Sequence, residues 1–546
     1  MPVRSLAATS FFDPEFVSPG CLVPGSVPWV LARCRSKWFP AWLFAEWRGQ
    51  GRRGRDAWPA VVLVTLVLLR WSEQGLSRRA AVRRAETDVA WRAAMGLALG
   101  TATPSERTVR DFERFLLRRH GSTQVPRYLL LHEYIARSGI EHGVVDAAKP
   151  AWAMDSTPMW CYGAARDTVR LLGDGLRMLA QAWGHATRRS LADVAAEWQL
   201  PLLLAKSTKG AFSIDWSKAA ATATVVTELA GNVVEAVAVV RRNLKSARSG
   251  LQKRLLRLCR HLVRIVSTDL DSDENGRLVI AERVAADRLV SITDPEARHG
   301  RKSKSQTFNG FKVHLLGDIV SGLVLSVAVT KGNVHDGEPA HRLIRRAKEL
   351  CANVNQVLAD TAYGGARLRH VVHRHLGVRL VAPPPPVNGK EGKIGKGDVI
   401  LNREARTATC ANGVVTDDIR LVWSSEHDVH VPLIAWPKAS CDACPLSARC
   451  RGKDTGRRRM MLHPYEDELR AAREAWSRPE IRGLYRTRTQ CERLVNQITR
   501  YGGRQARAFG LQHAQLQAHA IAMASNLRLL AKALAIAGAR QQAAAA

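Results

Sequence analysis

The chain has 546 residues, and its 82 Lys and Arg residues against 49 Asp and Glu residues give a formal net charge of +33. This length predicts several domains, and a hydrophobic content of 46% excludes a disordered chain. A positive charge of this size attracts polyanions, so DNA, RNA and acidic membrane surfaces are the candidate partners. The alternative is an ordinary soluble enzyme from an Arg-rich proteome, which the clustering of the arginines disfavours.

Neither a membrane span nor a signal peptide is expected. The longest apolar run, residues 61–69, ends at Arg70, whereas a span needs roughly 20 residues. The N-terminus lacks the basic start and apolar core of a signal peptide. We therefore expect a reducing cytoplasm, where a tight cluster of cysteines suggests a metal site more than disulfides.

Residues 31–125 have the pattern of a helical domain, preceded by a loosely ordered arm at residues 1–30. Near the end of this domain Thr103 or Ser105 can cap a helix. That helix is rich in arginine: Arg107, Arg110, Arg114, Arg118 and Arg119. A small helical domain with an Arg-rich helix suits a DNA groove, and the alternative is a solvated basic face.

Strand and helix patterns over residues 150–385 predict an α/β core with a central mixed sheet flanked by helices, interrupted by a helical insertion at about 165–265. The apolar run at 151–160 contains Asp155, and the run VLAD ends at Asp360. We expect both acids at the ends of strands, which is where such sheets collect ligands.

Two carboxylates on neighbouring strand ends can hold divalent cations about 4 Å apart. The alternative for each is a structural role, because an Asp that follows a strand often caps the next helix or forms an Asx-turn. Their positions alone do not separate these two acids from the other 47 Asp and Glu residues.

A third acid lies in the segment 481–503, which we expect to form one helix. Tyr485, Arg488 and Glu492 are spaced i, i+3 and i+7, so they share one narrow face of that helix. Glu492 can complete a metal site, and Arg488 can grip a phosphate with its guanidinium. The alternative is a solvent-exposed ion pair between Arg488 and Glu492.

Together, the strand with Asp155, the strand with Asp360 and the pattern Tyr-x2-Arg-x3-Glu ending at Glu492 resemble the DDE transposases of bacterial insertion sequences. The segments SITDPEARHGRKSKSQTFNGFKVHLL, VTKGNVHDGEP and VLADTAYGG resemble a Cys-containing branch of that superfamily with an N-terminal helical domain. The resemblance covers roughly residues 30–530. It rests on several separate motifs in the same order.

The resemblance implies a ribonuclease-H-like catalytic core. It implies that Asp155, Asp360 and Glu492 bind two Mg²⁺ or Mn²⁺ ions, and that Tyr485 and Arg488 contact DNA near the cleaved end. The chain departs from the family pattern at one position. The family has a Lys seven residues after the Glu, where this chain has Thr499 followed by Arg500. Arg500 is therefore the candidate for that phosphate contact.

A second basic group is expected beside the site. Alternation along a strand places Lys312 and His314 on one face. With a neighbouring loop they form a predicted contact to the DNA backbone: Lys312, His314, Arg301 and Lys302. The alternative is a solvated hairpin tip. Asp336, in GNVHDGEP, resembles a further motif of the family and equally suits the cap of a helix.

A Cys-rich insertion is expected at residues 386–455. The spacing of CDACPLSARC is typical of a tetrahedral thiolate site, and the predicted zinc ligands are Cys410, Cys441, Cys444 and Cys450. His463 is the alternative fourth ligand, and free thiols in a loop are the alternative to zinc. Zinc would stabilise a small insertion that has little core of its own.

Three further segments complete the chain. Residues 271–282 have the spacing of a calcium-binding loop, but we predict a turn because a strand pattern follows and no paired loop is evident. Residues 456–535 form the helical end of the catalytic core and carry the third acid. Residues 536–546 are expected to be a frayed tail.

These features predict a DNA transposase that cleaves the ends of an insertion sequence and joins them to target DNA by two-metal phosphoryl transfer. Its expected partners are double-stranded DNA, as terminal inverted repeats and target, and a second copy of the chain in a synaptic homodimer. We expect it in the bacterial cytoplasm, at the nucleoid and not at a membrane. The alternatives are an inactive DNA-binding protein derived from a transposase and a nuclease of the same fold without strand transfer.

Overall fold

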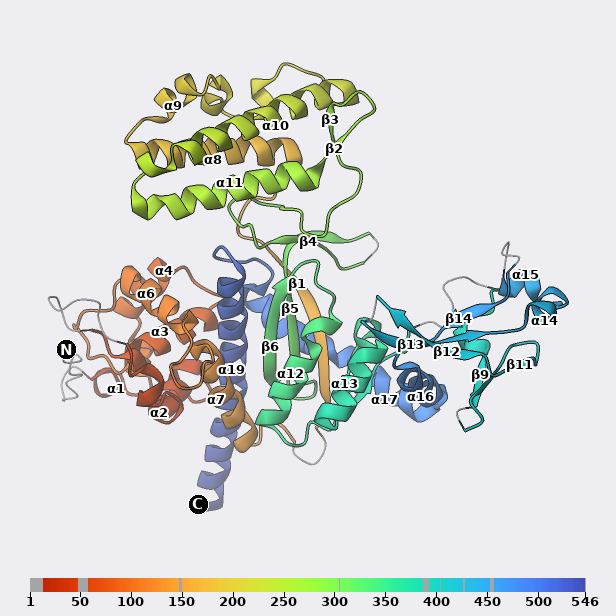
Figure 1. The fold of residues 1–546 in the computed structure, drawn as a ribbon. Coiled ribbons are helices and arrows are strands. Elements are labelled where there is room, and N and C mark those ends of the chain that lie inside the picture. Colours follow the sequence, from red (N-terminus) through yellow and green to blue (C-terminus); the bar gives the residue numbers. More distant parts are fainter. Residues whose placement is uncertain are drawn as a thin grey trace.

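A six-stranded mixed sheet lies at the centre of the chain (Figure 1). The computed structural model describes residues 13–47, 57–146, 150–303, 305–385, 392–402, 404–425, 428–451 and 456–545. The path through the sheet is β4-β5-β1-β7-β8, with β6 paired to β5. Its strands are β1 (Trp152–Trp160), β4 (Arg298–Arg301), β5 (Thr307–Asp318), β6 (Val324–Lys331), β7 (Gln356–Leu358) and β8 (Arg379–Val381).

The antiparallel half of the sheet is built on β5, which pairs with β1, β4 and β6. A tight turn joins β5 and β6 into a hairpin. Asp318 accepts hydrogen bonds from the backbone N–H and the hydroxyl of Ser321, and Gly322 has a φ of 84° that favours glycine. The strands β7 and β8 run parallel to β1 and complete the sheet.

Helices from both ends of the chain pack together beside the sheet. The N-terminal helices are α1 (Pro14–Val17), α2 (Val27–Trp38), α3 (Ala60–Ser72), α4 (Arg78–Thr87), α5 (Val89–Met95), α6 (Glu106–Leu117) and α7 (Arg127–Glu141), with a 3₁₀ turn η2 (Ala41–Phe44). Helix α3 is apolar on all sides and almost wholly buried, so it forms the centre of this group. Ser105 caps α6 as predicted.

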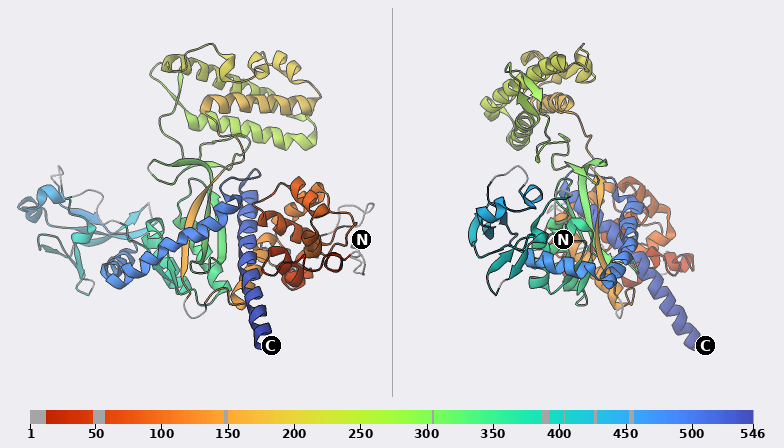
Figure 2. Two further views of the ribbon diagram at one scale, coloured as in Figure 1. Left: turned by 180° about the vertical axis from the view of Figure 1, so that it is seen from behind. Right: turned by 90° about the vertical axis from the view of Figure 1, so that its right-hand side faces the viewer.

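Two expectations about the termini are corrected. Residues 1–12 lie outside the described residues, but α1 and the start of α2 fall within the segment 13–30 that we expected to be loosely ordered. The tail is also helical, because α19 (Leu511–Ala545) continues through residues expected to fray. Its end is rich in alanine, the strongest helix former, which favours continuation of the helix (Figures 1 and 2).

A four-helix group with its own hydrophobic core follows β1, as Figure 1 shows above the sheet. Its elements are α8 (Thr168–Thr187), α9 (Leu191–Glu197), α10 (Ala219–Arg242) and α11 (Ser249–Asp269), with the 3₁₀ turns η3 (Pro201–Leu204), η4 (Lys209–Ala211) and η5 (Leu244–Ser246). We call it the helical bundle. The predicted turn that follows is confirmed as the hairpin of β2 (Leu270–Ser272) and β3 (Leu278–Ile280).

Among the described residues, α10 and α19 are long and apolar enough to cross a membrane by length and composition, which we had not expected. Both helices have protein packed against them instead. Helix α10 packs on α8, α11 and β3, and α19 packs on α7, β6 and α3. About half of each apolar window is buried, as in the core helices of a folded domain.

The elements that follow β6 pack on the sheet or extend beyond its β8 edge (Figure 1). They are α12 (Gly337–Leu350), η6 (Thr361–Tyr363) and α13 (Ala366–Leu376), followed by the segment with the cysteines. That segment contains η7 (Lys396–Asp398), β9 (Ile400–Asn402), β10 (Thr407–Thr409), β11 (Val415–Thr416), β12 (Ile419–Ser424), β13 (Val429–Ala435), α14 (Lys438–Asp442), α15 (Ser447–Cys450) and β14 (Arg459–Met461). It forms two small three-stranded sheets.

The chain then returns to the central sheet through a series of short helices. These are α16 (Glu466–Ser477), α17 (Pro479–Arg486), η8 (Thr487–Cys491), α18 (Glu492–Ile498) and η9 (Thr499–Gly503). The single helix predicted for 481–503 is therefore wrong. An α-helix, a 3₁₀ segment, a second α-helix and a π-helical turn with a kink at Tyr501 and Gly502 occupy that stretch.

Candidate active site

Asp155 lies within β1, not at its end. The strand continues to Trp160 because β5 offers hydrogen-bonding partners as far as Gly310, which corrects the predicted boundary. Residues opposite each other in an antiparallel pair share a face, so Asp155 lies on the same face as Leu315, its partner on β5. Helix α18 and the 3₁₀ segment η8 pack against this part of the sheet.

Asp360 lies directly after β7, as predicted, and its carboxylate caps η6 by accepting a hydrogen bond from the N–H of Ala362 at 3.0 Å. The parallel pairing of β1 and β7 sets Ala153 beside Leu358. Asp155 is two residues beyond Ala153 on β1, and Asp360 is two residues beyond Leu358, the last residue of β7. The register therefore brings Asp155 and Asp360 side by side.

Arg488 connects the two acids. Its Nη2 atom donates to Oδ2 of Asp155 at 3.1 Å and lies 3.9 Å from Oδ2 of Asp360. Tyr485 lies against the same guanidinium and packs edge-on against Trp476, with ring centroids 4.9 Å apart. The buried Nε atom of Arg488 has no hydrogen-bond partner among the described residues. The guanidinium thus has capacity for one more acceptor.

Burial raises the pKa of Asp155 and of Asp360, and Arg488 opposes this shift in both. The proximity of the carboxylates adds to it, because each carboxylate disfavours charge on its neighbours. Burial, the largest single cause, would lower the pKa of Arg488, but Asp155, Tyr485 and Asp360 together outweigh burial and raise it. The cluster has two carboxylates and one guanidinium, so additional positive charge beside Asp155 and Asp360 would be stabilising.

A third aspartate, Asp336, lies beside the cluster at the start of α12. It accepts a hydrogen bond from the hydroxyl of Ser156 at 2.9 Å and forms an ion pair with Lys312. Burial is the main cause that raises the pKa of Tyr363 well above its ordinary value, and Asp336 adds to the shift. We had considered Asp336 only as a motif residue or a helix cap, and its pairing with Lys312 had no signal in the sequence.

The predicted exposed basic surface at Lys312 and His314 is wrong. His314 is completely buried between Thr330, at 2.9 Å, and the hydroxyl of Tyr363, at 3.3 Å. Burial lowers its pKa to about 4, so it is neutral near pH 7. The alternation of the strand was interpreted correctly, but α12 packs against β5, so that His314 is buried and Lys312 is only partly exposed.

Glu492 is exposed at the first residue of α18 and has no described contact with the two aspartates. The 3₁₀ segment η8 accounts for this placement. Four residues of α-helix leave Glu492 about 40° from Arg488 around the axis, whereas four residues of 3₁₀ helix leave it about 120° away. Within the described part of the chain, no three His, Cys, Asp or Glu side chains are arranged to hold a metal ion.

The other predicted DNA contacts lie at the surface. Arg107 and Arg110 of α6 are exposed and lie 3.8 Å from Asp111. Arg301 and Lys302 are exposed at the end of β4, while Lys304 of the same loop lies outside the described residues. Arg500 is exposed in the π-helical turn η9.

The four predicted zinc ligands come together around one small cavity of about 30 Å³: Cys410, Cys441, Cys444 and Cys450. Burial raises the pKa of Cys450, and the other three cysteines are close enough to add to the shift. The alternative ligand His463 does not line the cavity. Among the described residues, these four cysteines are not arranged as a group that could hold a metal ion.

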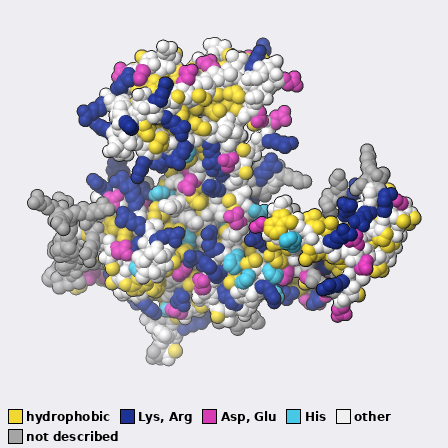
Figure 3. Space-filling view, in the orientation of Figure 1, with side chains coloured by type: hydrophobic (Ala, Val, Ile, Leu, Met, Phe, Trp, Pro, Cys, Tyr) yellow, Lys and Arg dark blue, Asp and Glu magenta, His cyan; other side chains and the backbone are white. Residues whose placement is uncertain are grey.

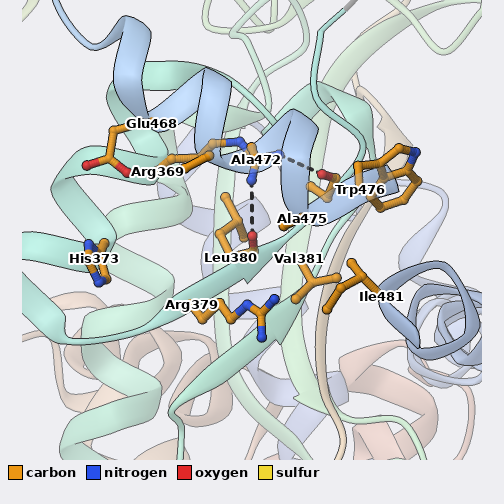
Figure 4. Close-up of a pocket in the computed structure, with 12 residues that line it drawn as sticks. Arg369, His373, Arg379, Leu380, Val381, Glu468, Ala472, Ala475, Trp476 and Ile481 are labelled. Carbon is orange, nitrogen blue, oxygen red and sulfur yellow. Dashed lines mark hydrogen bonds between the residues drawn. The ribbon is translucent and has the colours of Figure 1, made fainter. Parts of the chain in front are cut away.

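A larger cavity of about 170 Å³ lies between α13, β8 and α16 (Figure 4). Its walls are mainly apolar, and the guanidinium of Arg369 is engaged by backbone carbonyls of Gly364, Leu380 and Ala382. Burial lowers the pKa of Arg369 to about 10. Because Gly364 ends the turn that begins at Asp360, Arg369 holds that turn in place.

Two family models match the chain. Residues 287–527 match the transposase DDE domain, and residues 37–114 match a transposase domain (DUF772). Together they cover more than half of the chain, and the first contains Asp360, Arg488 and Glu492, whereas Asp155 precedes it. No curated protein and no solved structure matches the chain. Both matches are to transposase domains. The chain belongs to the DDE transposases of the insertion-sequence type.

Proposed function

We propose that this transposase cleaves the ends of its insertion sequence and joins them to target DNA, with Asp155, Asp360 and Glu492 as its catalytic carboxylates. The observation that carries the proposal is the cluster in which Arg488 spans Asp155 and Asp360, with Arg488 and Asp360 inside the match to the transposase DDE domain. The strand order β6-β5-β1-β7-β8 supports the expected ribonuclease-H-like core.

The family uses divalent metal ions, and the donor set at the cluster fits them. Two neighbouring carboxylates share a single guanidinium, and oxygen ligands of this kind are those that Mg²⁺ and Mn²⁺ prefer. We propose that Asp155, Asp360 and Glu492 hold two such ions. When bound, a pair of ions activates the attacking oxygen and stabilises the leaving one. Glu492 joins the aspartates only if residues 487–492 change conformation.

Arg488 has a second task in this proposal. Its guanidinium now neutralises Asp155, and its Nε atom is buried without a partner. A phosphate is a bidentate acceptor that matches the fork of an arginine. We propose that Arg488 moves from Asp155 to a DNA phosphate when metal ions bind the carboxylates of the cluster. Tyr485 would keep the guanidinium of Arg488 oriented.

Further DNA contacts are proposed at the exposed cations Arg107, Arg110, Arg301, Lys302 and Arg500. The N-terminal helices would recognise the terminal inverted repeats, and two copies of the chain would hold the two ends in a synaptic homodimer. Such a protein works in the bacterial cytoplasm at the nucleoid. These assignments are supported by the exposure of the side chains and by the net charge of +33.

A structural zinc ion is proposed in the segment 392–462. The four cysteines around one cavity form a thiolate donor set of the kind that zinc prefers, in a region whose own hydrophobic core is small. The metal would then contribute directly to the folding of this segment.

The experiment is cleavage of a supercoiled plasmid that carries the gene of this chain with its flanking DNA, in the presence of Mg²⁺. The proposal expects double-strand breaks at the element ends and joined products in target DNA. Breaks without joined products would favour the nuclease alternative. DNA binding without breaks would favour the inactive DNA-binding alternative.

A further inference from the structure

Helix α11 of the helical bundle carries a continuous row of cations that the proposed site does not use. Its Lys253, Arg257, Arg260 and Arg264 are spaced by four, three and four residues. At 100° per residue these side chains fall within an arc of about 60°, and the row is about 16 Å long. The opposite face is apolar and buried, with Leu255, Leu258, Leu262 and Ile265 in the core of the bundle.

Three of the four cations in the row have no acidic partner among the described residues. Nine Lys or Arg residues and no Asp or Glu occur from Arg241 to Arg264. Lys253, Arg257 and Arg260 are exposed, and among the described residues no carboxylate is paired with them. Arg264 alone has an acidic partner, Asp287 at 2.7 Å. The arginines of α6, in contrast, surround Asp111.

The row also ends close to the catalytic sheet, at Arg264. Figures 1 and 2 place α11 on the side of the bundle that faces the rest of the chain, and Figure 3 shows Lys and Arg side chains gathered there. Burial is the main cause that lowers the pKa of Arg298 of β4, and Arg264 is close enough to add to that shift. The same strand ends at the exposed Arg301, followed by Lys302. The cations therefore extend from α11 to the edge of the sheet that carries Asp155.

We propose that the row Lys253, Arg257, Arg260 on α11 binds the phosphate backbone of duplex DNA and guides it toward the catalytic sheet. This inference rests on the proposed function, since it assigns a second contact surface for the same DNA. An exposed row of cations without carboxylate neighbours suits phosphates rather than base edges, so the contact is independent of sequence. These three residues span about 10 Å of the helix axis, a length that covers several phosphates of one strand, which follow one another every 3.4 Å along the axis.

The test is duplex DNA binding by the full chain with Lys253→Gln, Arg257→Gln and Arg260→Gln combined. Glutamine keeps a long side chain with good helix propensity and removes only the charge. The matched control combines Arg166→Gln, Arg170→Gln and Arg189→Gln. These arginines are exposed on the same bundle and each pairs with an acid. Both combinations remove three positive charges, so a general effect of net charge is the same in both.

Binding is measured with a duplex of arbitrary sequence over a range of NaCl concentrations. If the row contacts three phosphates, the slope of log K against log salt becomes shallower by about 2.7 in the α11 variant, and affinity at 0.1 M NaCl falls by about tenfold or more. The control keeps the wild-type slope. Thermal unfolding of both variants is followed in parallel, and unchanged transitions confirm that the bundle is folded.

Equal slopes for the two variants would overturn the inference while leaving the proposed function intact. The same holds if the α11 variant keeps its duplex affinity and loses binding to phosphatidylglycerol vesicles, because the row would then recognise a lipid surface. A wild-type chain that shows no salt-dependent duplex binding would instead contradict the proposed function itself.

Discussion

The Nη2 atom of Arg488 lies 3.1 Å from a carboxylate oxygen of Asp155, although 333 residues separate them in the chain. This contact joins the first strand of the central sheet to the segment that carries Glu492. Asp155 and Asp360 also share this one guanidinium as their positively charged neighbour.

Replacement of Arg488 by Gln should destabilise the fold. The variant leaves two partly buried carboxylates without their cation, which costs about 1–3 kcal/mol. Urea unfolding at pH 7 measures the loss, and addition of Asp155→Asn to the same chain should restore part of it. Arg486→Gln, at an exposed position two residues earlier, is the control and should unfold like the wild type. Equal stability of all three variants would mean that the ion pair contributes nothing.

Stability should fall in mild acid because of buried histidines between α7 and α19. His132 and His519 lie with their Nδ1 atoms 3.0 Å apart, and burial lowers the pKa of His132 to about 4 and that of His519 well below its ordinary value. The unfolded chain therefore binds protons below about pH 6.5 that the folded chain does not. Each such histidine costs about 1.4 kcal/mol of stability per pH unit as the pH falls from 6.5 toward 4.

The substitution His132→Gln separates this contribution from those of other groups. Glutamine can still donate a hydrogen bond to the carbonyl of Val324 but does not titrate, so the slope of stability against pH should decrease by about one proton. His185→Gln, at an exposed position of α8, is the control and should leave the slope unchanged. A slope that is identical in both variants and the wild type contradicts the prediction.

Elemental analysis of the purified chain should find one zinc ion per molecule. Cys444→Ser removes one of the four cysteines around the small cavity and should release the metal. Cys351→Ser, a half-buried cysteine outside that cavity, should retain it. Absence of zinc from the wild-type chain would leave the four side chains as free thiols.

Glu492→Gln should abolish DNA cleavage even though Glu492 is exposed and touches neither aspartate. Its removal should not lower stability, because the side chain makes no described contact that the fold needs. Glu480→Gln, an exposed glutamate of α17, should cleave at the wild-type rate. Full activity of the Glu492 variant would remove the third carboxylate from the proposed site.

The parts of the site that sequence reasoning predicted are those with a local signal. Asp360 was predicted after a short apolar strand because a turn with two glycines follows it. The approach of Asp155 depends on the parallel register of Ala153 with Leu358, two residues 205 positions apart, and no local pattern encodes that pairing. The ion pair of Lys312 with Asp336 was missed for the same reason.

Two errors have a shared physical origin, since periodicity does not reveal how an element is packed. The α and 3₁₀ conformations tolerate similar residues, so the segment from Tyr485 to Glu492 was interpreted as one helix. Alternation placed Lys312 and His314 correctly on one face of β5, but only the packing of α12 decides that this face is buried. Long-range packing therefore decides where Glu492 and His314 lie.

The most direct measurement is cleavage of the plasmid-borne element by the variant Asp360→Asn in Mg²⁺. Asparagine keeps the oxygen that caps η6, so the fold and DNA binding should persist while the charge is lost. Asp271→Asn, an exposed position of β2, is the matched control. The account predicts no cleavage by the Asp360 variant and wild-type cleavage by the control. Cleavage by the Asp360 variant at the wild-type rate would contradict the assignment of this cluster as the active site.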